Sequence, residues 1–204
     1  MPERRKPTKS ELSAAAGSET VPDYVRPGLA LLLVGINPGL YSGATGHHFA
    51  RPGNRFWPAL HKSGLTPRQL HPSEEAELLT HGIGLTKVVQ RATATAAELT
   101  DEEVRAGGEV IRKMVRKHKP RAVCFLGVGT YKQAYGLKKA DVGLQPEPFE
   151  GAQLWVLPNP SGLNANYQMK DFVRLFKQVW ASIDRDPPRQ QAAPERTRKK
   201  DSMS

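Results

Sequence analysis

The sequence has little cysteine and no long apolar run. Cys124 is the single cysteine among 204 residues, which excludes a disulfide framework, a Cys-rich zinc site and a Cys-ligated iron–sulfur cluster. No apolar run approaches the ~20 residues of a membrane-spanning helix, and the first residues lack the apolar stretch of a secretory signal. We therefore expect a cytoplasmic protein with no membrane partner.

Acidic residues are also scarce relative to basic ones. The chain has 30 Lys and Arg against 20 Asp and Glu, a formal net charge of +10, and most of the excess falls within residues 21–183. A balance this basic favours a polyanionic partner such as nucleic acid. The alternative is a charge excess that only maintains solubility.

Large apolar residues are nearly absent from both ends of the chain. Residues 1–20 and 184–204 are rich in Pro, Ser, Ala, Lys, Arg and Glu. Such segments bury too little apolar area to offset the entropy lost on ordering, so we predict two disordered tails. Residues 21–183 remain as a single domain, which the total length also favours.

Within this domain, apolar runs alternate with helical patterns. Short continuous apolar runs predict buried strands at 30–36, 122–126 and 154–157, and the mixed run 83–89 predicts a strand or a loop. Helices are predicted at 54–63, at 73–81 with Ser73 as cap, from a Thr100–Glu103 capping box to about 117, at 131–135 and at 172–183. The alternation indicates an α/β fold whose sheet is mostly parallel.

Two Gly- and Pro-rich segments directly follow predicted strands. The first is Gly35-Ile-Asn-Pro-Gly-Leu40, continued through residues 45–57 (TGHHFARPGNRFW), and the second is Leu157-Pro-Asn-Pro-Ser-Gly-Leu163. In parallel sheets the ligand site lies beyond the carboxyl ends of the strands, so both segments belong at that edge.

Together, the two segments resemble the signature motifs of the uracil-DNA glycosylase superfamily, and more closely those of its mismatch-specific and thymine-DNA glycosylase branch. The similarity extends from about Leu31 through Leu163. It implies a three-layer α/β/α fold with a short, mostly parallel central sheet. It also implies a monomer that removes uracil from mismatched double-stranded DNA with water as nucleophile, leaving an abasic site for downstream repair enzymes. No metal or cofactor is implied, and 3,N4-ethenocytosine and, weakly, thymine are implied as further substrates.

The resemblance also implies roles for individual residues. Asn37 would position the attacking water, because a carboxamide orients water but accepts no proton usefully at neutral pH. Phe49 would stack on the flipped base, with Ile36, Tyr41, Ser42 and Asn159 as the other base contacts. Lys87, Ser161 and Gly162 would contact DNA, and Leu163 would be the wedge that fills the space of the extruded nucleotide. The family often has an arginine shortly after this leucine, whereas Asn164-Ala165-Asn166 follow here.

Several residues have simpler interpretations. We expect Asp101 and Glu98 to cap a helix, with assistance to catalysis as a minority hypothesis. His47 and His48 are predicted to be solvated loop residues, since no acidic or Cys ligand lies at a metal-binding spacing from them. Arg55 either supports the structure or faces DNA.

Two other functions are compatible with parts of the sequence. A glycosylase-like fold could bind mismatched or abasic DNA without cleaving it. A nucleotide-binding α/β protein of another kind is disfavoured, because the sequence contains no Gly-Lys-Ser/Thr phosphate loop.

Overall fold

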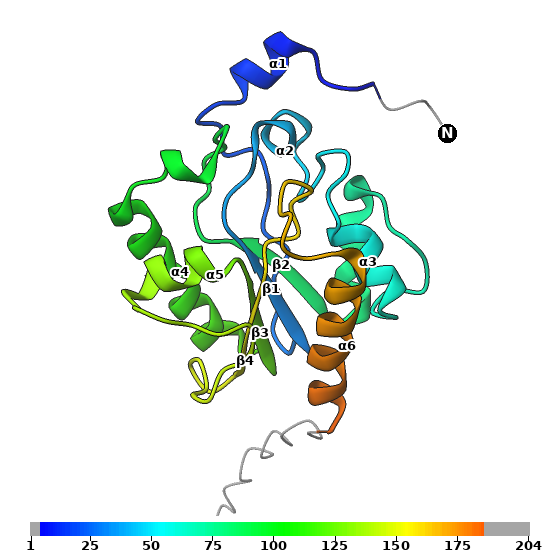
Figure 1. Cartoon of the computed structure of the whole chain (residues 1–204), viewed down its shortest axis with the longest axis vertical. Coiled ribbons are helices and arrows are strands. Elements are labelled where there is room, and N and C mark those ends of the chain that lie inside the picture. The colour runs from blue at the N-terminus through cyan, green and yellow to red at the C-terminus, as the bar shows by residue number, and fades with distance from the viewer. Residues whose placement is uncertain (1–4, 186–204) are drawn as a thin grey trace, which may run out of the picture.

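The computed structural model describes residues 5–185 and contains a five-stranded sheet in the order β2-β1-β3-β5-β4 (Figure 1). The four parallel strands are β1 (Leu31–Gly35), β2 (Ile83–Lys87), β3 (Ala122–Leu126) and β5 (Gln153–Leu157). The two-residue strand β4 (Gly143–Leu144) pairs antiparallel with β5 at one edge. The predicted strands are confirmed, and the mixed run at 83–89 forms β2.

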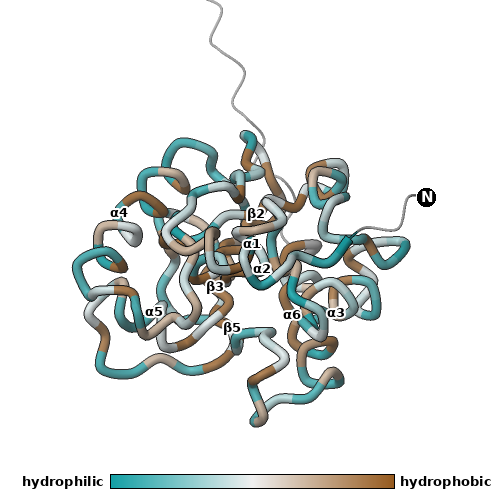
Figure 2. Tube along the Cα trace, turned by 90° about the horizontal axis from the view of Figure 1, so that it is seen from above, coloured by the Kyte–Doolittle hydropathy of each residue, from teal (hydrophilic) through white to brown (hydrophobic). Residues whose placement is uncertain are grey.

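Both faces of the sheet are covered, which explains why its strands are continuous apolar runs. Leu31 and Leu33 of β1 pack on one side with α3 (Phe56–Lys62), the 3₁₀ helix η1 (Pro72–His81) and α6 (Met169–Arg185). Leu32 and Val34 pack on the other side with α4 (Asp101–His118) and α5 (Val128–Tyr135). The predicted three-layer α/β/α fold is confirmed. Seen from above, the strands lie at the centre, where the trace is largely hydrophobic, and most hydrophilic residues lie on the helices and loops around them (Figure 2).

Three short helices depart from the prediction. The segment after β1 contains α2 (Leu40–Thr45), and η2 (Ala96–Glu98) precedes α4. The predicted α-helix at 73–81 is instead η1, which begins at Pro72 and is capped by the His71 side chain, not by Ser73. The first N–H group of a helix has no acceptor within the helix, so proline, which lacks an N–H, is well suited to this position. This explains the start at Pro72.

The N-terminal segment is the largest departure. The sequence predicted disorder over residues 1–20, but residues 9–14 form α1 (Lys9–Ala14), with Thr8 and Glu11 in a capping box. Ala15, directly after this helix, is only 5 % exposed. A segment of small residues can be ordered by close backbone contacts, which apolar periodicity does not detect. Of the predicted C-terminal tail, residues 186–204 lie outside the described residues.

Candidate active site

The two motif segments meet at the carboxyl edge of the sheet, beyond β1 and β5. The backbone N–H of Arg55 in the first segment donates to the carbonyl of Pro160 in the second, at 3.0 Å. Gly162 lies so close to Gly53 that a Cβ at Gly162 would be 2.7 Å from the Gly53 carbonyl oxygen. Glycine is therefore required where the two loops touch. The order of the parallel strands therefore brings the two predicted segments into contact.

Asn37 has a fixed carboxamide. Its Nδ2 donates to the Thr93 hydroxyl at 2.7 Å, to the Arg91 carbonyl at 3.0 Å and to the Pro38 carbonyl at 3.2 Å. A carbonyl only accepts hydrogen bonds, so these partners settle which end of the amide is NH₂. The Thr93 hydroxyl donates in turn to the Thr95 carbonyl at 2.8 Å, which leaves its lone pairs for Asn37.

The other end of this carboxamide is available. Within residues 5–185, no group donates a hydrogen bond to Asn37 Oδ1, and the residue is half-buried. Because three hydrogen bonds fix the NH₂ group, the direction of the amide oxygen is fixed as well. This oxygen can accept a hydrogen bond from a water molecule and so orient that water. Thr93 was missed in the sequence because 56 residues separate it from Asn37.

Phe49 is a half-buried aromatic ring in a strained backbone position. Its φ is 51°, in the left-handed region that few L-residues adopt. The ring stacks on Phe56, with centroids 4.1 Å apart and planes at 23°, and its edge lies against Gly35. Phe56 and Trp57 are buried, as predicted for core anchors, and Trp57 Nε1 donates to the His48 carbonyl at 3.1 Å. Phe56 therefore supports one face of the Phe49 ring, and part of the ring remains exposed.

Glu75 of η1 anchors the loop that carries Phe49. This carboxylate is 1 % exposed and accepts hydrogen bonds from the Tyr24 hydroxyl at 3.2 Å, from the His48 backbone N–H at 2.8 Å and from His47 Nδ1 at 2.9 Å. Burial raises the pKa of Glu75 above its ordinary value. No sequence signal identified this residue, which lies 26 positions after Phe49.

The expectation of solvated histidines is wrong for His48. It is 5 % exposed, and its Nε2 lies 2.8 Å from the Pro22 carbonyl. Burial lowers the pKa of His48 to about 4, so the ring is neutral at pH 7 and Nε2–H donates. His47 keeps a third of its side chain exposed beside Glu75. Both histidines therefore fix the loop.

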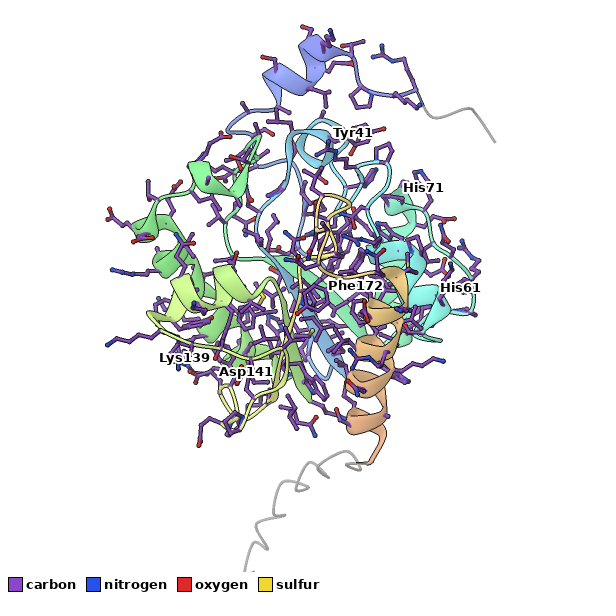
Figure 3. The ribbon with its side chains drawn as sticks, in the orientation of Figure 1. Tyr41, His61, His71, Lys139, Asp141 and Phe172 are labelled. Atoms are coloured by element: carbon purple, nitrogen blue, oxygen red, sulfur yellow. The ribbon has the colours of Figure 1, made fainter. Side chains whose placement is uncertain are left out.

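Three more residues predicted near the base lie directly after β1, for Ile36, and on α2, for Tyr41 and Ser42. Ile36 accepts a hydrogen bond from the Val89 N–H at 2.9 Å, and its side chain packs on Gly127. Ser42 is buried, and its Oγ accepts from the Ala50 N–H at 3.2 Å. Tyr41 points to the α1 side of the molecule (Figure 3), where it lines a cavity of about 590 Å³. Ser42 thus lies on the loop side of α2 and Tyr41 on its outer side.

The second segment forms a loop shaped by its own polar groups. Asn159 Oδ1 accepts from the Ser161 N–H at 3.0 Å, and the Ser161 hydroxyl accepts from the Leu163 N–H at 3.3 Å. These bonds direct Leu163 outward, where 75 % of it is exposed, the largest exposure among the large apolar side chains of residues 5–183. Asn159 Nδ2 has no partner among the described residues.

Arg55 joins this loop to the domain. Its guanidinium donates to the carbonyls of Ser161 and Tyr167, and to that of Asn164 at 2.8 Å, and it lies over the Phe172 ring at 5.0 Å. The sequence left open whether Arg55 supports the structure or faces DNA. These contacts give it the structural role.

The comparison with known families supports this arrangement. The family model for the uracil DNA glycosylase superfamily matches residues 22–184. The chain belongs to this superfamily. Its members are typically DNA glycosylase hydrolases, so membership assigns a uracil-glycosylase type of activity on DNA. The match covers both motif segments and every predicted site residue, but not α1 or residues 15–21.

One predicted DNA contact of this glycosylase-superfamily domain is not supported. Lys87 is 2 % exposed, and its Nζ pairs with Asp23 Oδ1 at 3.0 Å. A buried, paired ammonium is not presented to a phosphate, so Lys87 has a structural role here. The sequence left residues 83–89 open as a strand or a loop, and the inward direction of the Lys87 side chain depends on Asp23, 64 residues earlier.

Arg51 is a cation of the first segment that no sequence motif singled out. It is exposed, has no ion-pair partner among residues 5–185 and lies in the first segment, between Phe49 and Gly53. Its neighbour Gly53 contacts the second segment, so Arg51 lies near the seam of the two loops. An unpaired exposed guanidinium here is suited to a phosphate.

The two carboxylates considered as assistants to catalysis have local partners. Glu98 accepts from the Thr95 N–H at 2.8 Å in a capping box, and Asp101, at the start of α4, accepts from Gln133 at 2.7 Å. Glu98 therefore caps η2 as expected, whereas the expectation is wrong for Asp101, because Thr100 and Glu103 cap α4 and the Asp101 carboxylate binds Gln133. In the described part of the chain, no group of three potential ligands is arranged for a metal ion, and no helix is long and apolar enough to cross a membrane.

Proposed function

We propose that this chain is a monofunctional DNA glycosylase that removes uracil from mispairs in double-stranded DNA. The observation that carries the proposal is the Asn37 carboxamide, whose NH₂ group is fixed and whose oxygen is free. It lies at the same sheet edge as a half-exposed aromatic platform and a protruding leucine. Each of these answers one requirement of excising a base that is stacked in a duplex.

The first requirement is to extract the nucleotide. A base inside a helix is unreachable, and flipping it out costs a few kcal/mol, less at a mispair. Leu163 protrudes from a loop held by Arg55, as an apolar wedge that enters the base stack must. This dependence on weak pairing favours G·U over A·U as the target.

The second requirement is to hold the flipped base. Phe49 offers the exposed part of a ring already supported by Phe56, and stacking of a base on an aromatic ring is worth ~1–3 kcal/mol. Asn159 Nδ2, which has no partner among the described residues, would donate to the base. We extend the proposal to 3,N4-ethenocytosine and, weakly, thymine, with Ser42 and Tyr41 limiting the group at the 5-position.

The third requirement is the bond exchange itself. Water bonded to Asn37 Oδ1 attacks C1′ of the sugar while the bond from C1′ to N1 breaks, and its electron pair leaves with the base. The sugar develops oxocarbenium character, as in glycoside hydrolysis, so a weakly activated water suffices. The proton lost by the water passes to solvent or to the departing anion, and the products are free uracil and an abasic site. Without a general base, the reaction is expected to be slow.

A panel of duplexes tests the proposal under single turnover. Uracil, thymine or ethenocytosine is placed opposite guanine or adenine, and free base and alkali-labile sites are both measured. We expect release of uracil opposite guanine first and fastest. Tight binding to G·U duplexes without base release would instead identify a damage-binding protein on this fold, and equal rates opposite guanine and adenine would remove the mismatch preference.

A further inference from the structure

Residues 15–20, which precede the family match, contact the segment that holds Asn37. The Gly17 N–H donates to the Ala92 carbonyl at 2.8 Å, and the Ala92 N–H donates to the Ser18 carbonyl at 2.8 Å. Ala92 is therefore held through both of its backbone polar groups. It is also the residue between Arg91 and Thr93, whose oxygens fix the Asn37 NH₂ group.

The same residues press on α2. A Cβ at Gly43 would lie 2.7 Å from the Ala92 Cβ, 3.1 Å from Ser18 Oγ and 3.4 Å from the Ala15 Cβ. The Thr20 hydroxyl donates to the Gly43 carbonyl at 2.5 Å. Ala15, Ser18 and Ala92 thus meet over one glycine, and the absence of a side chain there allows the contact.

These contacts close a chain of support around the carboxamide. The Thr93 N–H donates to the Pro38 carbonyl at 3.0 Å, so the 91–93 segment holds Asn37 through both its side chain and the following residue. Residues 15–20 cover the outer side of that segment, at the end of the molecule where α1 lies above α2 (Figure 1). A shift of Ala92 would move two of the three oxygens that hold the Asn37 NH₂ group, those of Arg91 and Thr93.

We propose that residues 15–20 are a brace that positions the Asn37 carboxamide by clamping Ala92 against α2. The inference rests on the proposed function for its effect on excision, but the brace itself is a property of the fold. The family match begins at residue 22, so the brace lies outside the part of the chain that the family model covers. It acts through other residues and touches no substrate.

Ala15→Asp in the full-length chain tests the brace, with Ala16→Asp as matched control. Ala15 is buried against Gly43, so a carboxylate there separates the segment from α2, whereas Ala16 is exposed and takes the same charge without a contact. We expect Ala15→Asp to slow single-turnover release of uracil at least tenfold, with the DNA dissociation constant within about twofold of the parent. Ala16→Asp should match the parent in both.

Two milder substitutions at Thr20 test the brace in case Ala15→Asp prevents folding. Thr20→Val removes the hydroxyl that donates to Gly43 and keeps the shape of the side chain, while Thr20→Ser keeps the hydroxyl. We expect a twofold to fivefold loss of rate for valine and near-parental rate for serine. Equal rates for all three proteins, together with a parental rate for Ala15→Asp, would overturn the proposal.

A double-mutant cycle separates positioning from general destabilisation. If the brace acts through Asn37, Ala15→Asp should slow the parent but have little further effect in the Asn37→Ala background. The same fold-loss in both backgrounds would mean that Ala15→Asp only reduces the amount of folded enzyme, and the brace would then have no positioning role.

Hydrogen exchange of the Asn37 side-chain NH₂, followed by NMR, tests the brace without any activity. We expect at least tenfold faster exchange in Ala15→Asp and no change in Ala16→Asp. If the parent releases no base from any duplex while this exchange result holds, the proposed function fails and the brace stands. If base release is normal and the exchange is unchanged in Ala15→Asp, the brace fails and the function stands.

Discussion

The two loops at the carboxyl edge of the sheet are held in opposite ways. The loop after β1 is anchored by groups distant in sequence: Glu75 binds His47 and His48, and Thr93 binds Asn37. The loop after β5 is shaped by bonds among its own residues and joined to the domain mainly through Arg55. The first arrangement suits groups that must be fixed relative to a reacting bond. The second suits a segment that must enter a duplex and leave it.

The sharpest way to break this comparison is Asn37→Ala. Removing the carboxamide should slow single-turnover excision about 10²–10³-fold, the range found when one preorganised polar group is lost from an active site. DNA affinity, measured by fluorescence anisotropy, should stay within about twofold, because the wedge and the platform remain. A parallel loss of rate and affinity would make Asn37 a binding residue and remove the distinction between the loops.

Arg55→Ala should release the second loop while leaving the first in place. It removes the bonds to the Ser161, Asn164 and Tyr167 carbonyls and the contact with the Phe172 ring. Bonds from a charged donor contribute about 1.5–3 kcal/mol, so the free energy of unfolding in urea should fall by about 2–3 kcal/mol.

Arg55→Lys is the matched variant for this test. It keeps the charge but cannot reach three carbonyls with a rigid fork, so it should recover less than half of the loss. Full recovery by lysine would show that the charge, and not the fork, holds the loop.

Acid should loosen the first loop through His48. The folded-state pKa of His48 is about 4, against an ordinary value of about 6.5, so between these values the unfolded chain binds a proton that the folded chain does not. Stability present above pH 6.5 is therefore lost as the pH falls towards 4. Relative to pH 7.5, we expect a loss of about 2–3 kcal/mol at pH 4.5.

His48→Gln isolates this contribution. Glutamine can still donate to the Pro22 carbonyl but does not titrate, so urea unfolding at pH 7.5 and 4.5 should give a smaller difference than in the parent. The raised pKa of Glu75 acts in the opposite direction, and it is present in both proteins. Equal acid sensitivity of the two proteins would mean that His48 does not control the acid stability of the loop.

The sequence predicted the parts of this fold that depend on local patterns. Short apolar runs identified the central strands, the Thr100–Glu103 capping box set the start of α4, and two motifs following strands identified the site edge. A strand buried on both faces and a capped helix each leave a signature within a few residues. These features needed no knowledge of what packs against them.

The missed features all depend on contacts between distant residues. Glu75 looks like a surface residue of an amphipathic segment until the loop at 47–48 is folded over it. Lys87 looks like a cation for phosphate until Asp23 is placed beside it. The order of residues 15–20 depends on Gly43 and Ala92, whose small size carries no periodic signal.

Leu163→Ala should weaken function without changing stability. The side chain is 75 % exposed, so the free energy of unfolding should not change measurably. Loss of the wedge should reduce excision from a duplex by about 1–2 kcal/mol, or about 5- to 30-fold, at ~0.8 kcal/mol per buried methylene. A single-stranded uracil substrate is the control, because no base stack has to be entered. An equal loss on single strands would assign Leu163 to the base pocket instead.

The smallest effect compares two cations of the site edge. Arg51 is exposed and unpaired among the described residues, whereas Lys87 is buried beside Asp23. If Arg51 neutralises one phosphate, Arg51→Ala should reduce the slope of log affinity against log salt concentration by about 1. Lys87→Met should leave that slope unchanged. It should instead lower the free energy of unfolding, because the Asp23 carboxylate loses its ion-pair partner. The reverse pattern, with the slope changed only by Lys87→Met, would mean that Lys87 leaves Asp23 when DNA binds, and the phosphate contact expected from the sequence would be restored.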